Sequence, residues 1–426
     1  MARLSLSRWL ALLLTSVVGT ISSGCSTLFP GSGTSGETTT GPTTSDSCSA
    51  TTKHAAPGGY YVVGNTVCTV DGHAHLFHGV DRPSLEWQPG GDHLSLADFQ
   101  LMAGWKANTV RIALNQDFWL EGSQYYDASY ASTVDSAVHW AEDAGLDVIL
   151  DLHWSDRGVL GSCDPANGCQ QVMADANSIT FWSQVASLYS GDGRVLFELY
   201  NEPHDVSWAA WKSGGNEGGF QVAGMQQLYD AVRAAGAENL VVMGGLSWAY
   251  DLSGVPDHRV SGYNILYATH PYNNSAASKA SNFDTYWGLL TKTDPVIVTE
   301  FGDGGECSSG TMPYVPAINT YVSDVITYAD QHNASWTAWA WYPGGCKFPA
   351  LINDWSGTPT PPGAVVQSAL AGYGEPAPGG KRDAGSLPDA ASTAADGGVG
   401  DGGATSVDGS KTSADGGSAT DGSLGG

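Results

Sequence analysis

Two glutamates each end a short apolar stretch of the sequence. Glu202 ends the run VLFELYNE, which starts at Val195, and Glu300 ends the run VIVTE, which starts at Val296. Two carboxyl groups that face each other can cleave an acetal, one giving a proton to the leaving oxygen and the other attacking the anomeric carbon. A separation of about 5–5.5 Å between the carboxyls gives retention of configuration at that carbon. We therefore predict a site for glycoside hydrolysis in which Glu202 is the acid/base and Glu300 is the nucleophile.

Other polar and aromatic side chains also lie where apolar stretches end. Arg111 is suited to keep Glu300 ionised, so that Glu202 holds the proton for the leaving group. Asn201 is suited to bind the 2-hydroxyl of the sugar, a contact that strengthens in the transition state. Trp341 is suited to offer a flat face to the sugar ring. The remaining members of the predicted substrate-binding set are His153, His270 and Tyr272.

Each of these residues also has a purely structural interpretation. Arg111 could pair with a carboxylate inside the fold, His153 and His270 could be hydrogen-bonded core histidines, and the tyrosine could only pack. A structural role for the two glutamates is disfavoured, because buried unpaired carboxylates are costly and are usually kept for use. His204 and Asp205, which follow the acid, are interpreted as residues that stabilise a loop.

The elements that must position these residues alternate between short β-rich runs and longer helical runs. Several β-rich runs are continuously apolar, as expected for strands buried on both faces. Eight strands are predicted, at His75–Asp81, Asn108–Leu114, Asp147–His153, Val195–Tyr200, Asn239–Gly245, Ile265–His270, Val296–Phe301 and Trp336–Trp341. The predicted helices are Leu96–Trp105 with Ser95 as N-cap, Tyr130–Ala144 before Gly145, Gln221–Ala235, Phe283–Leu290 and Tyr314–Gln331.

Eight repeats of strand and helix predict an α/β fold, a closed (β/α)8 TIM barrel, with an open doubly wound sheet as the alternative. In such a barrel the active site lies at the carboxyl ends of the strands. The fourth and seventh strands lie across the barrel from each other, so the two glutamates could flank one bond.

The segment Leu196–Pro203, LFELYNEP, resembles the signature of glycoside hydrolase family 5, the large cellulase family. The resemblance extends over residues 58 to 373, with WTAWAWYP at Trp336–Pro343 similar to bacterial endo-β-1,4-glucanases. It implies a (β/α)8 barrel that works without a metal or other cofactor. The loops Gly302–Cys307 and Gly344–Cys346 are less typical of the family and leave the outer subsites open. The site set of the family is matched in order by Arg111, His153, Asn201, Glu202, His270, Tyr272, Glu300 and Trp341.

The composition is strongly acidic, with 17 Lys and Arg against 43 Asp and Glu and a formal net charge of −26. Such a surface repels nucleic acid, anionic membranes and polyanionic polymers, so a neutral polysaccharide is the expected partner. Several tryptophans fall on or near predicted loops and indicate subsites for several sugar units: Trp87, Trp119, Trp154, Trp208, Trp211 and Trp248.

Residues 1–25 are predicted to be an export signal. Arg3 and Arg8 precede the apolar run Trp9–Val18, which is too short to span a bilayer as a stable anchor. The residues before Cys25 resemble a bacterial lipoprotein cleavage box, although that box usually carries Leu where Ser22 stands. A lipid-anchored Cys25 and a plain cleaved signal are both open, and we expect an exported monomer, secreted or tethered at the cell surface.

Three further segments follow the signal. Residues 26–54 are predicted to be a linker rich in Ser, Thr and Gly, and residues 55–373 the catalytic domain. Residues 374–426 consist mainly of Gly, Asp, Ser and Ala without an aromatic residue, and are predicted to be a disordered tail. The lack of aromatic residues also disfavours a carbohydrate-binding module there.

Seven cysteines are present, and six remain when Cys25 is set aside. An even number in an exported chain indicates disulfides. Proximity in the sequence favours Cys48–Cys68 and Cys163–Cys169, and the remaining pair would be Cys307–Cys346, in the loops after the seventh and eighth strands. A zinc site is disfavoured, because no pair has Cys-x-x-Cys spacing and no nearby His completes a set of ligands.

The expected function is a retaining endo-β-1,4-glucanase that acts on cellulose or soluble β-glucan. A mannanase, a xyloglucanase or another β-glycosidase of the same family is the alternative, and a non-catalytic sugar-binding barrel is a more distant one. The intact pair of glutamates disfavours the last.

Overall fold

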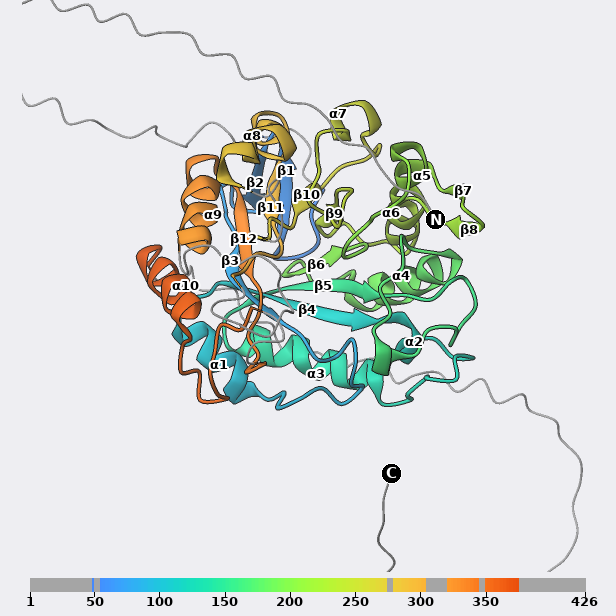
Figure 1. Cartoon of the computed structure of the whole chain (residues 1–426), viewed down its shortest axis with the longest axis horizontal. Coiled ribbons are helices and arrows are strands. Elements are labelled where there is room, and N and C mark those ends of the chain that lie inside the picture. The colour runs from blue at the N-terminus through green and yellow to red at the C-terminus, as the bar shows by residue number, and fades with distance from the viewer. Residues whose placement is uncertain (1–47, 50–53, 274–278, 304–319, 345–348, 375–426) are drawn as a thin grey trace, which may run out of the picture. The chain divides into compact units, whose positions relative to one another are not determined.

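The computed structural model describes residues 48–49, 54–273, 279–303, 320–344 and 349–374. Its centre is a closed barrel of eight parallel strands, which confirms the predicted (β/α)8 fold and excludes the open sheet (Figure 1). The barrel closes where the last strand pairs with the first, in the register Trp336 to His78 and Ala338 to Val80. The barrel strands are β3 (His78–Arg82), β4 (Thr109–Asn115), β5 (Asp147–Trp154), β6 (Val195–Glu198), β9 (Val241–Gly244), β10 (Ile265–Thr269), β11 (Val296–Val298) and β12 (Ser335–Ala338).

All eight predicted strands are confirmed, but several end earlier than predicted. β6 ends at Glu198 and β12 at Ala338, so Asn201, Glu202 and Trp341 lie in the loops that follow these strands. The sequence continues to look β-rich there because the loop residues are buried and apolar or aromatic. The earlier end of β12 changes which tryptophan lies beside the site.

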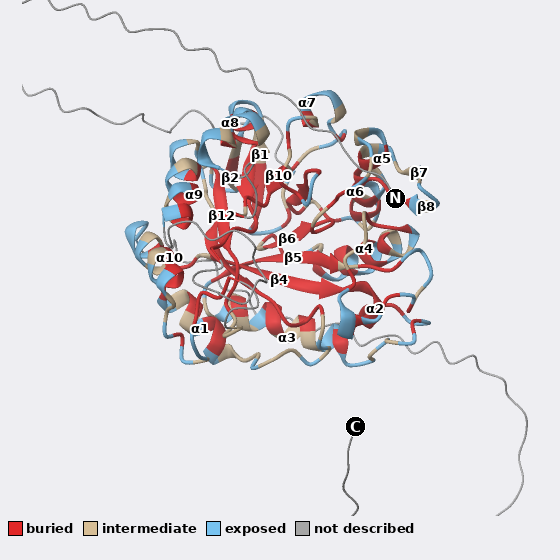
Figure 2. Ribbon diagram, viewed as in Figure 1, coloured by how far each residue is buried: buried red, intermediate tan, exposed pale blue. Residues whose placement is uncertain are grey.

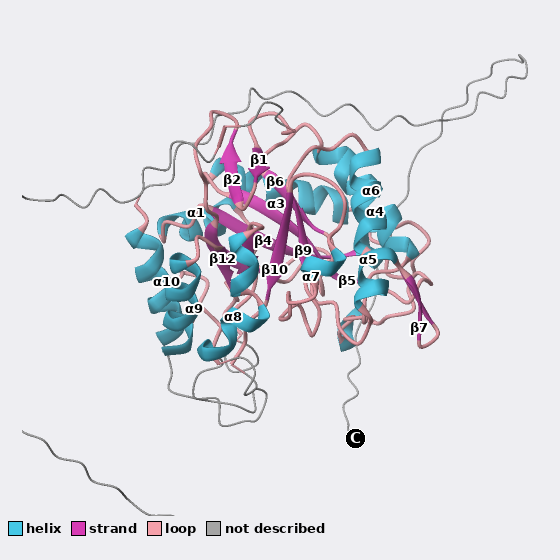
Figure 3. Cartoon of the chain, turned by 90° about the horizontal axis from the view of Figure 1, so that it is seen from above, coloured by secondary structure: helices cyan, strands magenta, loops and turns pink. Residues whose placement is uncertain are grey.

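Helices surround the barrel (Figure 3). Ser95 caps α1 as predicted, its side chain accepting a hydrogen bond from the backbone N–H of Asp98. The helix predicted from Gln221 begins only at Met225, because Phe220–Val222 pairs with Gly215–Glu217 in a small hairpin, β7–β8. The helices are α1 (Leu96–Gly104), α2 (Gln116–Trp119), α3 (Tyr130–Asp143), α4 (Ala176–Tyr189), α5 (Trp208–Ser213), α6 (Met225–Ala234), α7 (Val255–His258), α8 (Phe283–Tyr286), α9 (Thr320–Gln331) and α10 (Pro361–Gly372).

Two long helices, α4 and α10, were not predicted. α4 begins with a capping box in which the side chain of Asp175 accepts from backbone N–H groups and the Ser178 hydroxyl bonds back to Asp175 N–H. α10 begins with two prolines after the cap Thr360. Asp-x-x-Ser and Thr-Pro-Pro are both helix-start signals that the sequence contained.

The described residues form two large apolar clusters, one between the strands and the helices and one inside the barrel, and a small third one around Cys48, Tyr61 and Cys68. The barrel strands are mostly buried (Figure 2). Inside the barrel, Ile149, Leu196, Val242, Leu266 and Ile297 form one buried cluster. These residues come from five successive strands, so the cluster is the floor on which the polar site rests.

A hairpin of β1 (Tyr60–Val63) and β2 (Thr66–Thr69) packs against this floor, because Tyr60 and Val67 belong to the same apolar cluster. The Tyr60 hydroxyl also donates to Asp147 at the start of β5, at 2.6 Å. The hairpin therefore covers the amino-terminal end of the barrel.

After α10, the Tyr373 ring stacks on His78 at the start of β3, with ring centroids 3.8 Å apart. The Tyr373 hydroxyl accepts from Trp336 Nε1 at 3.2 Å and donates to Asp330 at 2.6 Å. The chain after the last strand thus binds back to the first and last strands of the barrel.

The predicted disulfides Cys48–Cys68 and Cys163–Cys169 are confirmed. The third predicted pair, Cys307–Cys346, lies outside the described residues, as do the predicted export signal, Cys25 and all of the predicted tail after Gly374. None of the helices that the structure describes has the length and apolar character needed to cross a membrane.

Candidate active site

The centre of the site is Arg111, a fully buried residue of β4. Its guanidinium donates from Nε to Glu198 at 2.5 Å, from Nη1 to Glu300 at 2.7 Å and from Nη2 to Asn201 Oδ1 at 2.7 Å. Nη2 also lies 3.0 Å from Asp151 Oδ2. A guanidinium has five donors in one plane, and here they orient four groups from three different strands or the loops after them, β5, β6 and β11.

Glu300 follows β11 and is buried. Its Oε2 accepts from the Tyr272 hydroxyl at 2.8 Å, while Oε1 accepts from Arg111. Burial raises the pKa of Glu300, but the positive charges of His270, Arg111 and His153 outweigh it, so the pKa is lowered from its ordinary value. The carboxylate is therefore ionised and oriented, as an attacking group requires.

Glu202 lies in the loop after β6 and is partly exposed. Its Oε1 lies 3.1 Å from His270 Nδ1, and the other nitrogen of His270 is 2.9 Å from the Thr299 hydroxyl. Thr299 in turn donates to Glu198 at 2.8 Å. A chain of hydrogen bonds therefore runs from Glu202 to the buried Glu198, whose pKa is lowered to about 2 because Arg111 and His270 overcome the effect of burial.

His153 is the next-to-last residue of β5. Its Nδ1 lies 2.7 Å from Asp151 Oδ2, and its Nε2 lies 3.4 Å from Asn201 Nδ2. Burial lowers the pKa of His153, but Asp151, Glu86 and Glu300 raise it, to about 9 in total. The imidazolium adds a second positive charge beside Glu300, at 3.9 Å from Oε1.

The two catalytic candidates approach each other closely. Ligand-type atoms of Glu202, His270 and Glu300 all lie within 4.8 Å of one another. One oxygen of Glu202 thus lies within 4.8 Å of one oxygen of Glu300, an approach that favours the roughly 5–5.5 Å carboxyl separation of retaining glycosidases over the roughly 6.5–9.5 Å of inverting ones. A cation could also bridge such atoms by distance alone, but Arg111 and two protonated histidines already supply positive charge there, which disfavours another.

Trp341 does not lie where the sequence placed it. Its side chain is 0% exposed, donates from Nε1 to Asp98 at 2.8 Å and packs edge-on against Trp105. An indole enclosed by α1 has no free face for a sugar. The prediction of a stacking platform at Trp341 is therefore wrong, because β12 ends three residues earlier than predicted.

Trp339 is the indole next to the candidate carboxylates. It directly follows β12, and its ring stacks on that of His153 with centroids 5.4 Å apart and planes 13° apart. Its 8% exposed surface contrasts with the complete burial of Trp341. The sequence contained a signal for this role, since Trp339 is the first residue after the last strand.

The structure therefore brings together seven of the eight predicted side chains, Trp341 being the exception. Three buried acids around Arg111 were missed: Glu198, Asp151 and Asp81. The sequence contained a signal for them, since a charged residue inside an apolar strand must be paired. Asp151 and Glu198 are also direct neighbours in the β5–β6 register.

Two groups of aromatic residues lie near residues of the site. Trp154 lies within 6.4 Å of His153, and Trp87 lies within 6.5 Å of Trp154 and 5.5 Å of Tyr342, by ring centroids. Trp248 is 49% exposed and stacks on His204, two residues after Glu202 in the chain, at 3.6 Å. The predicted loop-stabilising role of His204 and Asp205 agrees with their contact at 2.9 Å.

The other tryptophans predicted to form subsites, Trp119, Trp208 and Trp211, belong to the main apolar core or pack against it. Trp211 is fully buried in the main apolar core, and Trp119 packs on Tyr130 of α3 and Phe181 of α4 with its Nε1 donating to Gln184, so neither offers a face to a sugar. Trp208 packs on Trp211 and His258. The prediction of subsite roles for Trp119 and Trp211 is therefore wrong.

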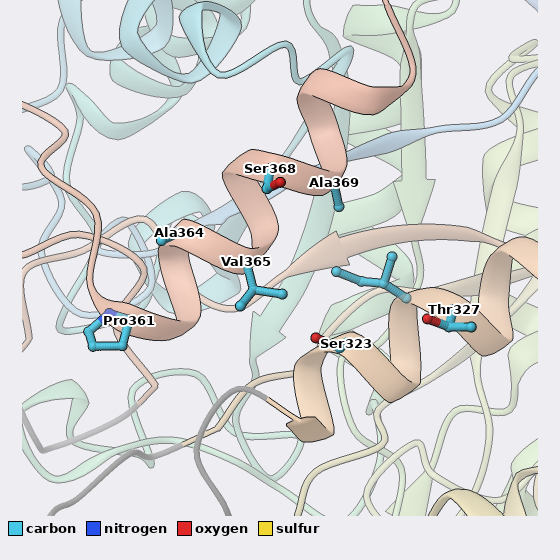
Figure 4. Close-up of a pocket in the computed structure, with 8 residues that line it drawn as sticks. Ser323, Thr327, Pro361, Ala364, Val365, Ser368 and Ala369 are labelled. Carbon is cyan, nitrogen blue, oxygen red and sulfur yellow. The ribbon is translucent and has the colours of Figure 1, made fainter.

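A separate groove of about 660 Å³ lies between α9 and α10 (Figure 4). It is lined by small and aliphatic residues without a titratable side chain, including Ser323, Thr327, Val365 and Ala369. Its hydroxyl groups have no carboxylate or histidine beside them in the lining to act as acid or base, so the chemistry is assigned to the carboxylates at the carboxyl ends of the strands.

A parallel eight-stranded barrel with two glutamates facing each other at its carboxyl end is the architecture of a glycoside hydrolase. The model of the cellulase family, glycosyl hydrolase family 5, matches residues 73–345. The chain belongs to glycoside hydrolase family 5.

Curated relatives are distant. Endoglucanase CelA of Streptomyces lividans is 26% identical over 336 residues, which cover 75% of this chain and 65% of the relative. Endoglucanase N of Pectobacterium atrosepticum is 24% identical over 264 residues, 62% of this chain and 52% of the relative. The chain thus spans about half to just under two thirds of the length of these relatives.

Solved structures give the same fold. A β-glucanase of Saccharophagus degradans has a TM-score of 0.62 and 25% identity, covering 78% of this chain and 97% of that one. Endoglucanase Cel5A of Thermobifida fusca has a TM-score of 0.55 and 20% identity, covering 73% and 97%.

We predict that the two buried histidines make the free energy of unfolding depend on alkaline pH. Burial opposes their charge, but neighbouring carboxylates raise the pKa of His153 to about 9 and that of His270 to about 10, from an ordinary 6.5. Their contribution to stability is complete below about pH 6.5 and is lost as the pH rises through 9 and 10. Denaturant unfolding across this range should show a falling free energy of unfolding.

The His153→Gln variant should show a shallower alkaline decline than the wild-type protein. His139 is a matched control, because it lies on the surface of α3 with a side chain 46% exposed. The His139→Gln variant should keep the wild-type slope. An equal slope in all three proteins would contradict the assignment of charged histidines.

Proposed function

We propose that the protein is a retaining endo-β-1,4-glucanase. The observation that carries this proposal is the close pairing of Glu202 and Glu300, the first partly exposed and linked to His270, the second ionised by Arg111 and Tyr272. The two environments differ as acid and nucleophile roles require.

In the first step the Glu300 carboxylate attacks the anomeric carbon while Glu202 gives its proton to the leaving oxygen. The glycosidic bond breaks, and an ester joins Glu300 to the sugar. In the second step the Glu202 carboxylate takes a proton from water, and the resulting hydroxide attacks the same carbon and releases Glu300. Configuration is retained because the carbon is inverted twice.

Asn201 is proposed to bind the 2-hydroxyl of the sugar at the reacting carbon. Its Oδ1 is fixed by Arg111 at 2.7 Å, so Nδ2 is the group that remains to donate. A hydrogen bond to the 2-hydroxyl strengthens as charge develops on the ring, which lowers the barrier. Trp339 is proposed as the face on which this sugar packs, in place of Trp341.

Endo-acting cleavage of a glucan is supported by several aromatic residues near the site, Trp87 and Trp154 beside His153 and Trp248 beside the loop of Glu202. Polymer-degrading sites bind several sugar units through such faces. Several relatives are named endoglucanases, and the Saccharophagus β-glucanase has been solved in complex with cellotetraose. A neutral β-glucan also suits a chain of net charge −26.

Export is part of the proposal. The two disulfides are typical of proteins that mature in an oxidising compartment. A polysaccharide too large to import is degraded outside the cell, which agrees with the predicted signal at residues 1–25.

A depolymerisation screen tests the function. Wild-type protein is incubated with mixed-linkage β-glucan, carboxymethylcellulose, glucomannan, galactomannan, xyloglucan and xylan, beside the Glu300→Gln variant. Oligosaccharides released from the glucans, and not by the variant, are the expected result. Release mainly from mannans or xyloglucan would keep the mechanism and refute the glucanase, and silence on all six polymers would refute both.

We predict that Trp248→Ala lowers kcat/KM on polymeric glucan by about threefold to tenfold, the value of one aromatic stacking contact. Trp248 lies beside the loop of the proton donor, so its face suits the sugar on the leaving-group side. An aryl cellobioside has no sugar there and should be cleaved at nearly the wild-type rate. Trp248→Phe keeps a flat ring and should lose much less, whereas equal losses on both substrates would contradict a leaving-group role.

The corrected tryptophan assignment gives another prediction. Trp339→Ala should lower kcat/KM of the folded variant on all substrates by about tenfold, because a sugar contact at the reacting carbon is lost. Trp341→Phe should instead keep nearly wild-type kcat/KM in the folded enzyme while destabilising the fold by about 1–3 kcal/mol, because Asp98 Oδ1 loses its donor and only Oδ2 keeps its contact with Arg82. A loss of kcat/KM in Trp341→Phe, with none in Trp339→Ala, would restore the original assignment.

A further inference from the structure

The loop after β5 is bonded along the segment that carries Asn201 and Glu202. The Tyr200 hydroxyl donates to Gln171 O at 2.7 Å, and His204 N–H donates to Val172 O at 2.9 Å. Between these two bonds, the side chain of Gln170 makes two more. The loop therefore contacts the catalytic segment at Tyr200, Asn201, Glu202 and His204.

The Gln170 amide contacts both functional residues of that segment. Its Oε1 accepts from Asn201 Nδ2 at 3.3 Å, and its Nε2 donates to the backbone oxygen of Glu202 at 3.2 Å. Both ends of one amide are thus used on adjacent residues, which fixes the orientation of Gln170.

The Cys163–Cys169 disulfide closes a short ring directly before Gln170. Such a ring limits the conformations of the residue that follows it. The neighbouring Gln171 is held on the other side, where its Oε1 accepts from Arg157 Nε at 3.0 Å. Gln170 is therefore placed by covalent and hydrogen-bonded neighbours, independently of any substrate.

The Asn201 amide has one acceptor and two hydrogens to place. Arg111 occupies the acceptor, and Gln170 takes one hydrogen of Nδ2. The remaining neighbour of Nδ2 is His153 Nε2 at 3.4 Å, a poor acceptor when the imidazole is protonated. One hydrogen of Nδ2 is thus left for the sugar.

We infer that Gln170 is a positioning residue for recognition of the sugar 2-hydroxyl, an inference that rests on the proposed function. By holding one hydrogen of Asn201 Nδ2, it directs the other to the 2-hydroxyl at the reacting carbon. Through Glu202 O it also fixes the backbone of the proton donor relative to that amide. Substrates with a 2-hydroxyl gain from this arrangement, and substrates without one do not.

The test compares an aryl β-cellobioside that has an activated leaving group with its analogue lacking the 2-hydroxyl on the ring that carries the aryl group. The ratio of kcat/KM for the two substrates measures how much the enzyme gains from the 2-hydroxyl. Gln170→Met, which keeps the length of the side chain without its amide, should lower this ratio by about tenfold, the effect of a lost hydrogen bond. Gln171→Met is the matched control, because its amide contacts Arg157, and it should keep the wild-type ratio.

A double-mutant cycle with Asn201→Ala separates positioning from a general effect on the loop. In the Asn201→Ala background, Gln170→Met should no longer change the ratio, because its partner is absent. An equal loss on both substrates, or an unchanged ratio in a folded Gln170→Met variant, would overturn the inference and leave the proposed function intact. Failure of the wild-type enzyme on both substrates would instead overturn the proposed function.

Discussion

Glu300→Gln should abolish turnover of every substrate, lowering kcat by at least about 10⁴-fold, while the barrel and sugar binding persist. An amide cannot form the glycosyl ester, and loss of a residue that acts in a catalytic unit removes most of the rate enhancement. The substitution keeps the shape of the side chain, so the hydrogen bond from Tyr272 can be retained. The expected result is a folded protein that binds cello-oligosaccharides in calorimetry and releases no sugar.

A covalent label identifies the nucleophile independently of kinetics. In a 2-deoxy-2-fluoro cellobioside the fluorine slows both steps, and a good leaving group speeds only the first. The second step is therefore the slower one, and the ester should accumulate on the wild-type enzyme. Peptide mass spectrometry should place the added mass on Glu300, and the Glu300→Gln variant should remain unlabelled. A label on another residue, or undiminished turnover by the variant, would refute the assigned nucleophile.

Glu202→Gln should lower kcat/KM on β-glucan by about 10²–10⁴-fold, the usual contribution of a positioned general acid. The loss should depend on the leaving group, because a sugar needs protonation to depart and an activated phenol does not. The first step on a dinitrophenyl cellobioside should therefore be nearly restored, with a fast burst of phenol followed by slow release of the sugar.

The contrast between the two variants is the sharper test. Rescue by a good leaving group is expected for Glu202→Gln and not for Glu300→Gln. If both variants were rescued equally, or if neither showed a burst, the division of roles between the two carboxyls would be wrong. A binding measurement with cellotetraose would confirm that both variants remain folded and competent to bind.

The barrel itself was predictable because its strands are short, continuously apolar and regularly spaced. Val148–Leu150 and Val296–Val298 are examples, and such runs are typical of strands buried on both faces. The ends of strands were less predictable. β6 and β12 are followed by loop residues as buried as the strands themselves, so composition did not indicate where the backbone hydrogen bonds of the sheet stop.

This uncertainty explains the one misplaced site residue. Taking β12 to end at Trp341 assigned the sugar platform to an indole that packs on α1, whereas the first aromatic residue after the strand is Trp339. The polar residues were placed well, because their types allow few structural alternatives in an apolar barrel. Which of them contact each other depends on the register between strands, which periodicity does not reveal.

Contacts between loops were the least predictable part. Nothing in the run of residues 155–175 indicates that Gln170, and not Gln171, faces Asn201. The left-handed backbone of Ser247, Trp248 and Ala249 was likewise not predictable, although it presents Trp248 to His204. Such features follow from tertiary packing, which overrides the preferences of single residues.

The part of the chain that folds as one unit is longer than the part that matches the family. The family match covers residues 73–345, but the β1–β2 hairpin precedes it, and α10 with Tyr373 follows it. A fragment cut at the limits of the match would expose the apolar floor to water at one end and leave His78 and Trp336 without their covering ring. For expression or engineering, the shortest sound unit therefore runs from before Cys48, which secures the hairpin, to beyond Tyr373.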